Sequence, residues 1–187
     1  MRPNIIFFLI DGLRADQVYG TDKTSYTPNI DSLIQKGTYF SNAFASVDGT
    51  IVSLNTIFSS NFQVGNAARS QKVTLIENNL IDTLKNNGYH IYGTFPNFTS
   101  FNSLRERFEN ENNSYDWIEP NIPPVSLPTG LATKIIQLLE SKEKQEPYFC
   151  YFHIFDLHPL REGKKPIGIE EFDNEKFGSS MYAKTVS

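Results

Sequence analysis

Asp11 is a carboxylate at the end of an apolar run, and this position suggests a metal ligand. The run NIIFFLI spans residues 4–10, and Gly12 follows Asp11 directly. A carboxylate beside a buried segment needs a cation, hydrogen bonds or solvent to remain ionised. Hard divalent cations prefer carboxylate oxygens as ligands. Asp11 is therefore predicted to bind a metal ion, and the alternative is an aspartate that serves only in a turn or as a helix N-cap.

Thr50 is the second candidate, because its hydroxyl is expected at the start of a helix. Thr50 follows Gly49 and precedes the segment IVSLNTIF. The unpaired N–H groups of a helix N-terminus favour an anion and so lower the cost of an alkoxide. A hydroxyl needs an adjacent base or a metal to become a nucleophile, and no histidine is near Thr50 in the sequence. A metal bound by Asp11 is the natural activator, and an ordinary N-cap threonine is the alternative.

The third group is His153, Asp156 and His158. His153 lies within the apolar run PYFCYFHIF, whereas Asp156 and His158 come after it. Two histidines and a carboxylate can bind a metal. Alternatively, His158 donates a hydrogen bond to an anionic substrate oxygen or protonates a leaving group. A packed, hydrogen-bonded histidine is the favoured interpretation of His153.

The elements that position these residues alternate between strands and helices. The predicted strands span 4–10, 38–46, 89–95 and 147–155, the first of them buried on both faces. Four helices are predicted: one from Thr27 to Gly37, one that begins at about Thr50, one that begins with a Thr74/Glu77 capping box, and one that spans residues 129–144. The segment 97–121 is expected to be irregular. Such alternation indicates an α/β sandwich with a mostly parallel sheet. Ligands bind such sheets at the carboxyl ends of the strands, so Asp11, Thr50 and His158 are expected to converge on one cleft.

The composition excludes several classes of protein. The chain has 187 residues, 39% of them hydrophobic, and a net charge of -4, which gives no electrostatic reason to expect nucleic acid as a partner. The single cysteine, Cys150, excludes an internal disulfide and is expected to be an inert core thiol. No run is long enough to span a bilayer, and no signal peptide is visible, so the expected location is the cytoplasm.

Four stretches of the sequence together resemble the sulfatase/alkaline phosphatase superfamily. RPNIIFFLIDGLRAD looks like its opening strand with the metal-binding aspartate. YTPNIDSLIQKGTYFSNAFA is similar to the helix and strand that follow in sulfatases and in lipoteichoic-acid-synthase-like phosphotransferases. NNLIDTLKNNGYHIYGTF resembles the next helix and Gly-Tyr strand, and EPYFCYFHIFDLHPL looks like the later strand whose final histidine lies by the substrate. The resemblance implies an alkaline-phosphatase-like α/β/α sandwich.

The segment around Thr50 departs from the sulfatase pattern. In sulfatases, a Cys or Ser begins a C/S-x-P-x-R motif and is oxidised to formylglycine. When TIVSLNTIFSS is aligned on Ser53 at the +3 position, Thr50 occupies the nucleophile position, Val52 replaces the proline and Leu54 replaces the arginine. Threonine cannot yield an aldehyde, because its β-carbon carries a methyl group. Thr50 therefore resembles the nucleophile of the phosphatase and phosphotransferase branches.

Residues 1–187 look like the N-terminal portion of a catalytic domain. The family's remaining metal ligands, an Asp-His pair and often a further His, come after the His158 segment, and SMYAKTVS resembles the start of the helix before them. The Lys/His motif that many sulfatases carry after the Gly-Tyr strand is absent. If the second half of the domain is missing, an uncovered sheet edge is expected to favour self-association.

The resemblance implies metal-dependent hydrolysis or transfer of a phosphate or sulfate ester, carried by a small molecule, a glycan or a lipid. Asp11 and Thr50 would bind a divalent ion (Mn, Zn, Mg or Ca), Thr50 would attack phosphorus, and His158 would bind and stabilise the substrate oxygens. One alternative is a sulfatase in the usual sense. The other is a non-catalytic remnant or binding module that retains the fold without the metal.

Overall fold

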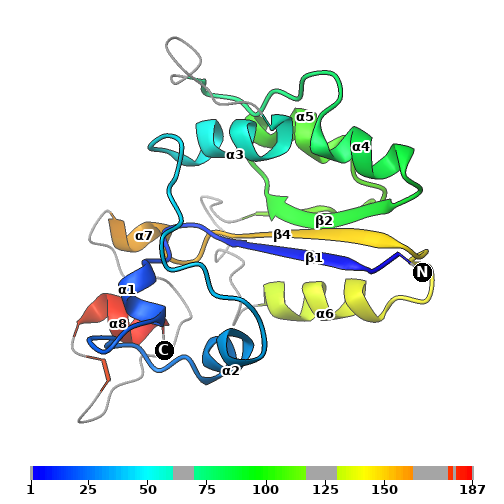
Figure 1. Ribbon diagram of the computed structural model, residues 1–187. Coiled ribbons are helices and arrows are strands. Elements are labelled where there is room, and N and C mark those ends of the chain that lie inside the picture. Colours follow the sequence, from blue (N-terminus) through cyan, green and yellow to red (C-terminus); the bar gives the residue numbers. More distant parts are fainter. Residues whose placement is uncertain (1, 61–69, 117–129, 162–176, 179, 187) are drawn as a thin grey trace. The chain divides into compact units, whose positions relative to one another are not determined.

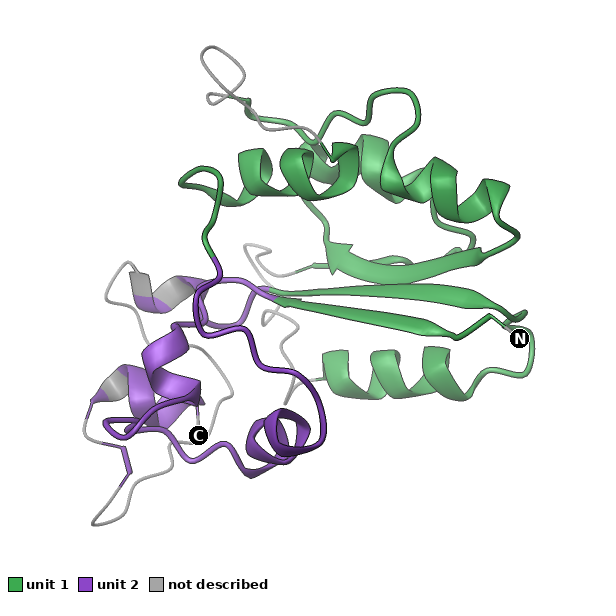
Figure 2. Cartoon of the chain, viewed as in Figure 1, with its two compact units in different colours: residues 1–9, 44–154 green, residues 10–43, 155–187 purple. Residues whose placement is uncertain are grey.

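The computed structural model describes residues 2–60, 70–116, 130–161, 177–178 and 180–186. The chain divides into two compact units, coloured separately in Figure 2. Unit 1 comprises residues 1–9 and 44–154, and unit 2 comprises residues 10–43 and 155–187. The chain therefore passes from unit 1 into unit 2 at the last residue of the first apolar strand, Ile10, and again directly after the later apolar strand that ends at Ile154.

Unit 1 is built on a four-stranded parallel sheet with the order β1-β4-β2-β3. The strands are β1 (Ile5–Ile10), β2 (His90–Pro96), β3 (Ser114–Tyr115) and β4 (Tyr148–Ile154). In the central pair, His90 lies opposite Tyr148 and Thr94 opposite Phe152. Parallel neighbours require crossover connections, and the helices of unit 1 lie in these connections. The predicted α/β class with a mostly parallel sheet is confirmed.

Helices cover both faces of this sheet (Figure 1). One face carries α3 (Thr50–Ser59), α4 (Leu80–Asn86) and α5 (Asn102–Arg105), and the other carries α6 (Ala132–Glu140). Strand β4 contributes to both cores, because Tyr151 packs with Phe58 and Phe95 on the first face while Cys150 and Phe152 pack on the second. Cys150, Tyr151 and Phe152 are all fully buried. A continuous apolar run is therefore the correct signature of a central parallel strand here.

Strand β1 is not buried on both faces, contrary to the prediction. Its odd-numbered residues pack partly against the core, whereas Ile6 and Phe8 are 45% and 49% exposed. β1 is the last strand on its side of the sheet formed by the described residues. An apolar run alone does not distinguish a central strand from a terminal one, and this explains the error.

The outer edge of β2 is closed by two side chains instead of a full partner strand. The Glu109 carboxylate accepts a hydrogen bond from the Ile91 amide at 3.0 Å. The Asn110 side chain accepts from the Gly93 amide and donates to the Gly93 carbonyl, both at 2.9 Å. These bonds satisfy backbone groups that an open edge would leave exposed. The segment predicted to be irregular thus contains the short helix α5, the two-residue strand β3 and this edge closure.

The predicted start of α4 is wrong. The helix begins at Leu80, and the side chain of Asn79 accepts a hydrogen bond from the amide of Asp82 at 3.0 Å. Asn79 is fully buried, whereas Thr74 and Glu77 are exposed and lie before the helix. The Thr-x-x-Glu pattern matches a capping box, but Asn is an equally good N-cap and lies closer to the apolar stripe.

Unit 2 contains α1 (Ala15–Val18), α2 (Pro28–Lys36), α7 (His158–Arg161) and α8 (Met181–Val186). The predicted boundaries of α2 are confirmed, with Thr27 at the N-cap, Pro28 at the first helical position and Gly37 at the C-cap. The predicted strand 38–46 is wrong, because these residues form turns and coil in which Phe40 and Phe44 are 75% and 92% exposed. In the described ranges, no helix is long and apolar enough to cross a bilayer.

Candidate active site

Asp11 lies in a tight turn directly after β1. The Leu13 amide donates to the Ile10 carbonyl at 3.3 Å, and Gly12 has a φ of 82°. These features are those of a type II turn, in which the third residue needs a positive φ and is usually glycine. Asp11 is 7% exposed. The N-cap alternative is wrong, since the N-cap of α1 is Arg14. The turn fixes where the Asp11 backbone lies, and an aspartate that serves only in a turn stays the alternative to the predicted metal ligand.

The Asp156–His158 segment lies against this turn within unit 2. A Cβ atom built on Gly12 would be 3.7 Å from the carbonyl oxygen of Leu157, which is ordinary contact distance. Asp156 is 3% exposed, so it is a second buried carboxylate in the unit. The two segments leave the neighbouring strands β1 and β4, and this explains why residues far apart in sequence meet here.

His158 is the first residue of α7 and is half-buried. Its ring stacks on Phe155, with centroids 4.1 Å apart and an interplanar angle of 16°. Its backbone amide donates to the Phe155 carbonyl at 3.1 Å. The stacking restricts the rotation of the imidazole, so its two nitrogens project from a fixed plane. A histidine held in this way suits a hydrogen-bond donor to a substrate oxygen.

His153 is a packed core histidine, as the sequence favoured. It is 1% exposed, its Nδ1 lies 3.0 Å from the Tyr151 hydroxyl, and its ring lies edge-on to Phe101 at 5.2 Å. Its carbonyl accepts a hydrogen bond from the Tyr115 hydroxyl at 2.7 Å. These contacts tie β4 to its neighbours in unit 1, and they give His153 a structural role.

Thr50 is the first residue of α3 in unit 1. The N-cap is Gly49, with a φ of 110° and no side-chain cap, so the interpretation of Thr50 as an ordinary N-cap is wrong. The helix is ten residues long, and its aligned peptide dipoles place a partial positive charge at its N-terminus. Its buried face includes Val52 at 5% and Leu54 at 0% exposure. The position at which sulfatases carry an arginine is therefore a core leucine, packed in the same cluster as Phe58.

Asp11 and His158 belong to unit 2 and Thr50 belongs to unit 1. The convergence of all three on one cleft consequently stays a prediction. Among the described residues, no group of three or more His, Cys, Asp or Glu side chains is arranged to hold a metal. The metal-ligand role of Asp11 and Thr50 also stays a prediction, which rests on the preference of divalent cations for hard oxygen ligands.

Cys150 is unsuited to chemistry. It is fully buried in β4, and burial raises the pKa of its thiol to about 11. The thiolate is the reactive form of cysteine, and it is scarce at neutral pH when the pKa is this high. This confirms the expected inert core thiol.

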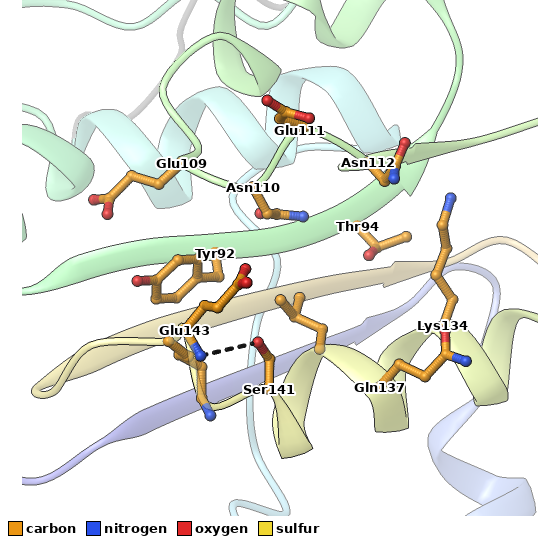
Figure 3. Close-up of a pocket in the computed structure, with 12 residues that line it drawn as sticks. Tyr92, Thr94, Glu109, Asn110, Glu111, Asn112, Lys134, Gln137, Ser141 and Glu143 are labelled. Carbon is orange, nitrogen blue, oxygen red and sulfur yellow. Dashed lines mark hydrogen bonds between the residues drawn. The ribbon is translucent and has the colours of Figure 1, made fainter.

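A polar groove of about 610 Å³ lies elsewhere in unit 1, between β2 and α6 (Figure 3). Its walls carry carboxylates and amides from the loop after α5, and its floor includes Tyr92 and Thr94. Lys134 projects toward it while donating to the Ser114 carbonyl at 2.7 Å, and desolvation lowers the pKa of this lysine. None of the three predicted site residues lines this groove.

The sulfatase family model matches residues 3–180. The chain belongs to the sulfatase family. Two solved structures share its fold: a candidate sulfatase of Bacteroides thetaiotaomicron (TM-score 0.64, 20% identity) and a 2-O GAG sulfatase (TM-score 0.63, 21% identity). Each comparison covers 96% of this chain and 40% of the other, so the chain spans about two-fifths of the length of these sulfatases. Among curated proteins, none matches the sequence.

These comparisons confirm the expected alkaline-phosphatase-like fold and the resemblance to the sulfatase/alkaline phosphatase superfamily.

The sequence did not reveal one contact of the Asp11 turn. The hydroxyl of Tyr182 bonds to its backbone from 170 residues further along the chain. No local pattern signals such a contact, because tyrosine has no periodic or turn-specific role at that position.

Proposed function

We propose that the protein contributes Asp11, Thr50 and His158 to a site for metal-dependent hydrolysis or transfer of phosphate esters, with Thr50 as the nucleophile. The observation that carries this proposal is the place of Thr50 at the first position of α3, after Gly49. Backbone N–H groups at a helix N-terminus stabilise developing negative charge on a nearby oxygen. Family membership supports a hydrolase of the sulfatase type at the coarser level.

The choice of phosphate over sulfate depends on the chemistry of the threonine side chain. The usual sulfatase nucleophile is a formylglycine made by oxidising Cys or Ser, and Thr50 cannot form it. Cys150 does not substitute, because it is buried in β4 with a pKa of about 11. The deprotonated Thr50 oxygen would attack phosphorus, break the ester P–O bond and release the substrate's alcohol, which leaves a phosphothreonine. Water or an acceptor alcohol would then attack this phosphorus and release the Thr50 hydroxyl, with inorganic phosphate or a new phosphate ester as the product.

Asp11 and Thr50 would hold the divalent cation, which supplies Lewis-acid activation of the hydroxyl and of the ester oxygens. The buried position of Asp11 supports this role, because a cation stabilises a carboxylate that water reaches poorly. His158, oriented by Phe155, would donate a hydrogen bond to a substrate oxygen. Further ligands are needed, since the described residues include no cluster of three.

The test is to trap the intermediate. The protein, in a form that supplies the further metal ligands, would be mixed with p-nitrophenyl phosphate and Mn²⁺ and quenched in acid. The peptide containing residues 46–60 would then be analysed by mass spectrometry. A single phosphoryl group on Thr50, retained in Thr50→Ser and absent in Thr50→Val, is the expected result. Thr50→Val keeps the shape of the side chain and removes only the hydroxyl, so it is the matched control. Formation of the adduct at another residue contradicts the proposal.

A sulfatase in the usual sense is the second candidate, favoured by the family model and by the two solved structures. It requires an aldehyde in the same 46–60 peptide, which mass spectrometry would detect as an altered Ser. A non-catalytic binding module is the third, favoured because the described part of the chain holds no group of three His, Cys, Asp or Glu side chains arranged for a metal. Metal analysis of the purified chain separates this candidate from both enzymes, because it predicts no bound divalent ion.

A further inference from the structure

A side chain from the last helix of unit 2 holds the backbone that carries Asp11. The Tyr182 hydroxyl donates to the Gly12 carbonyl at 2.5 Å and accepts from the Arg14 amide at 2.8 Å. One phenolic hydroxyl thus pairs with two backbone groups of the same short segment. Neither group belongs to a strand ladder, so the hydroxyl takes the place of regular secondary structure.

The turn needs such support. Gly12 has a φ of 82°, and the turn hydrogen bond across it, from the Leu13 amide to the Ile10 carbonyl, is 3.3 Å long. The two bonds to Tyr182 are both shorter than this one. Glycine adopts this φ without strain, so the conformation depends on the hydrogen bonds that hold the segment. Tyr182 therefore supplies part of the constraint that fixes the direction in which Asp11 leaves β1.

The position of Tyr182 is itself well defined. Ser180 caps the start of α8, where its Oγ accepts from the Ala183 amide at 3.1 Å and its carbonyl accepts from the Lys184 amide at 3.0 Å. Ala183 is fully buried, and the guanidinium carbon of Arg14 lies 5.8 Å from the centre of the Tyr182 ring. Burial also raises the pKa of the Tyr182 hydroxyl, which keeps the group neutral and able both to donate and to accept.

We propose that Tyr182 is a positioning residue for Asp11, acting through the backbone of Gly12 and Arg14. The proposal rests on the proposed function, in which Asp11 binds the cation. Tyr182 does not itself touch the cation or the substrate. Because α8 and the Asp11 turn share these two hydrogen bonds, cation binding at Asp11 and the local order of α8 are coupled, and each stabilises the other.

The first measurement concerns the turn alone and uses Tyr182→Phe. The variant keeps the ring and loses the hydroxyl. Its matched control is Tyr19→Phe, which alters a tyrosine in the same unit that is 48% exposed and stacked on Tyr39. Amide exchange and the Asp11 carboxyl carbon resonance would be followed by NMR. Tyr182→Phe should speed exchange of the Arg14 amide by about tenfold and shift the Asp11 resonance, and the control should change neither.

The second measurement adds Mn²⁺ to the same variants and follows water-proton relaxation. Tyr182→Phe should weaken Mn²⁺ binding by about threefold to tenfold, Asp11→Asn should abolish it, and Tyr19→Phe should leave it unchanged. Saturating Mg²⁺, which is diamagnetic and leaves the amide signals visible, should slow exchange of the Arg14 amide in the unaltered chain.

The outcomes separate the two proposals. An unchanged Arg14 amide and Asp11 resonance in Tyr182→Phe overturn the positioning role, whether or not Mn²⁺ binds. Exchange that rises equally throughout unit 2 also overturns it, because it indicates a general structural role. If the unaltered chain does not bind Mn²⁺, the metal role of Asp11 in the proposed function fails, and the exchange measurement still decides whether Tyr182 fixes the turn.

Discussion

Gly12 and Leu157 lie in contact, although 144 other residues separate them in the chain: a Cβ atom on Gly12 would be 3.7 Å from the Leu157 carbonyl oxygen and 3.8 Å from its Cβ. This contact joins the segments that follow β1 and β4, and each segment carries a buried aspartate, Asp11 in one and Asp156 in the other. Two buried carboxylates therefore lie on adjoining segments that follow neighbouring strands of the sheet.

Replacing Gly12 tests how strictly this turn is defined. Space is sufficient for a Cβ atom, but the φ of 82° is unfavourable for an L side chain. Gly12→Ala should lower the free energy of unfolding by about 1–2 kcal/mol in urea denaturation. Gly12→Asn should cost less, because asparagine tolerates this conformation better than alanine. Equal stability of Gly12→Ala and the unaltered chain would contradict the backbone geometry.

Replacing Asn79 tests the observed start of α4. Asn79→Ala removes the cap on the Asp82 amide and the side-chain bond to the Ile76 carbonyl at 2.7 Å. The expected loss is about 1–2 kcal/mol of unfolding free energy. Thr74→Ala is the control, because Thr74 is exposed and lies before the helix. A larger loss in Thr74→Ala than in Asn79→Ala would restore the capping box that the sequence suggested.

The sequence predicted the elements whose signals are local. Pro28 and Gly37 delimit α2 correctly, and the apolar runs locate β2 and β4. The errors occur where the burial or the secondary structure of a segment depends on its position in the fold. The run in β1 has the same composition as a central strand, yet Phe8 is half exposed because β1 ends the sheet of described residues. The aromatic segment 38–46 has strand-forming residues and lies outside the sheet.

The candidate site shows the same division. The two apolar runs correctly located β1 and β4, and the segments that follow them adjoin because the carboxyl ends of parallel strands share one edge. The site roles of Asp11 and His158 stay predictions. The turn at Gly12 was also visible in the dipeptide Asp-Gly. The bond from Tyr182 to Gly12 was not visible, because a contact 170 residues apart depends on tertiary structure alone. The convergence of Thr50 with Asp11 stays a prediction.

The buried thiol of Cys150 predicts a specific pH dependence. Its pKa rises from 9.0 to about 11 on folding, because burial penalises the thiolate. A raised pKa means that the folded state prefers the neutral thiol, so this contribution to stability is complete below pH 9 and is lost as the pH rises through about 11. Cys150→Ala should therefore reduce the decline in unfolding free energy between about pH 9 and pH 11, the window that the shift defines.

The same property predicts slow alkylation of the native protein. Iodoacetamide at neutral pH should leave Cys150 unmodified for hours and should modify it rapidly once urea unfolds the chain. The measurement is the mass of the intact protein over time. Fast alkylation of the native chain would show that β4 opens locally, and it would contradict the packing of Cys150 against α6.

The exposed residues of β1 predict self-association. Ile6 and Phe8 point from the terminal strand of the described sheet and are 45% and 49% exposed. A strand edge with unpaired backbone groups and apolar side chains favours pairing with a second chain, and burying one such side chain contributes about 1.5–3 kcal/mol. Light scattering across a dilution series should therefore show an average mass that decreases as the protein is diluted. Phe8→Lys should shift the chain toward the monomer, since it places a charge at the edge, whereas Phe44→Lys, at a 92% exposed position away from the strand, should not. A mass that stays monomeric at every concentration would mean that β1 is covered within the chain itself.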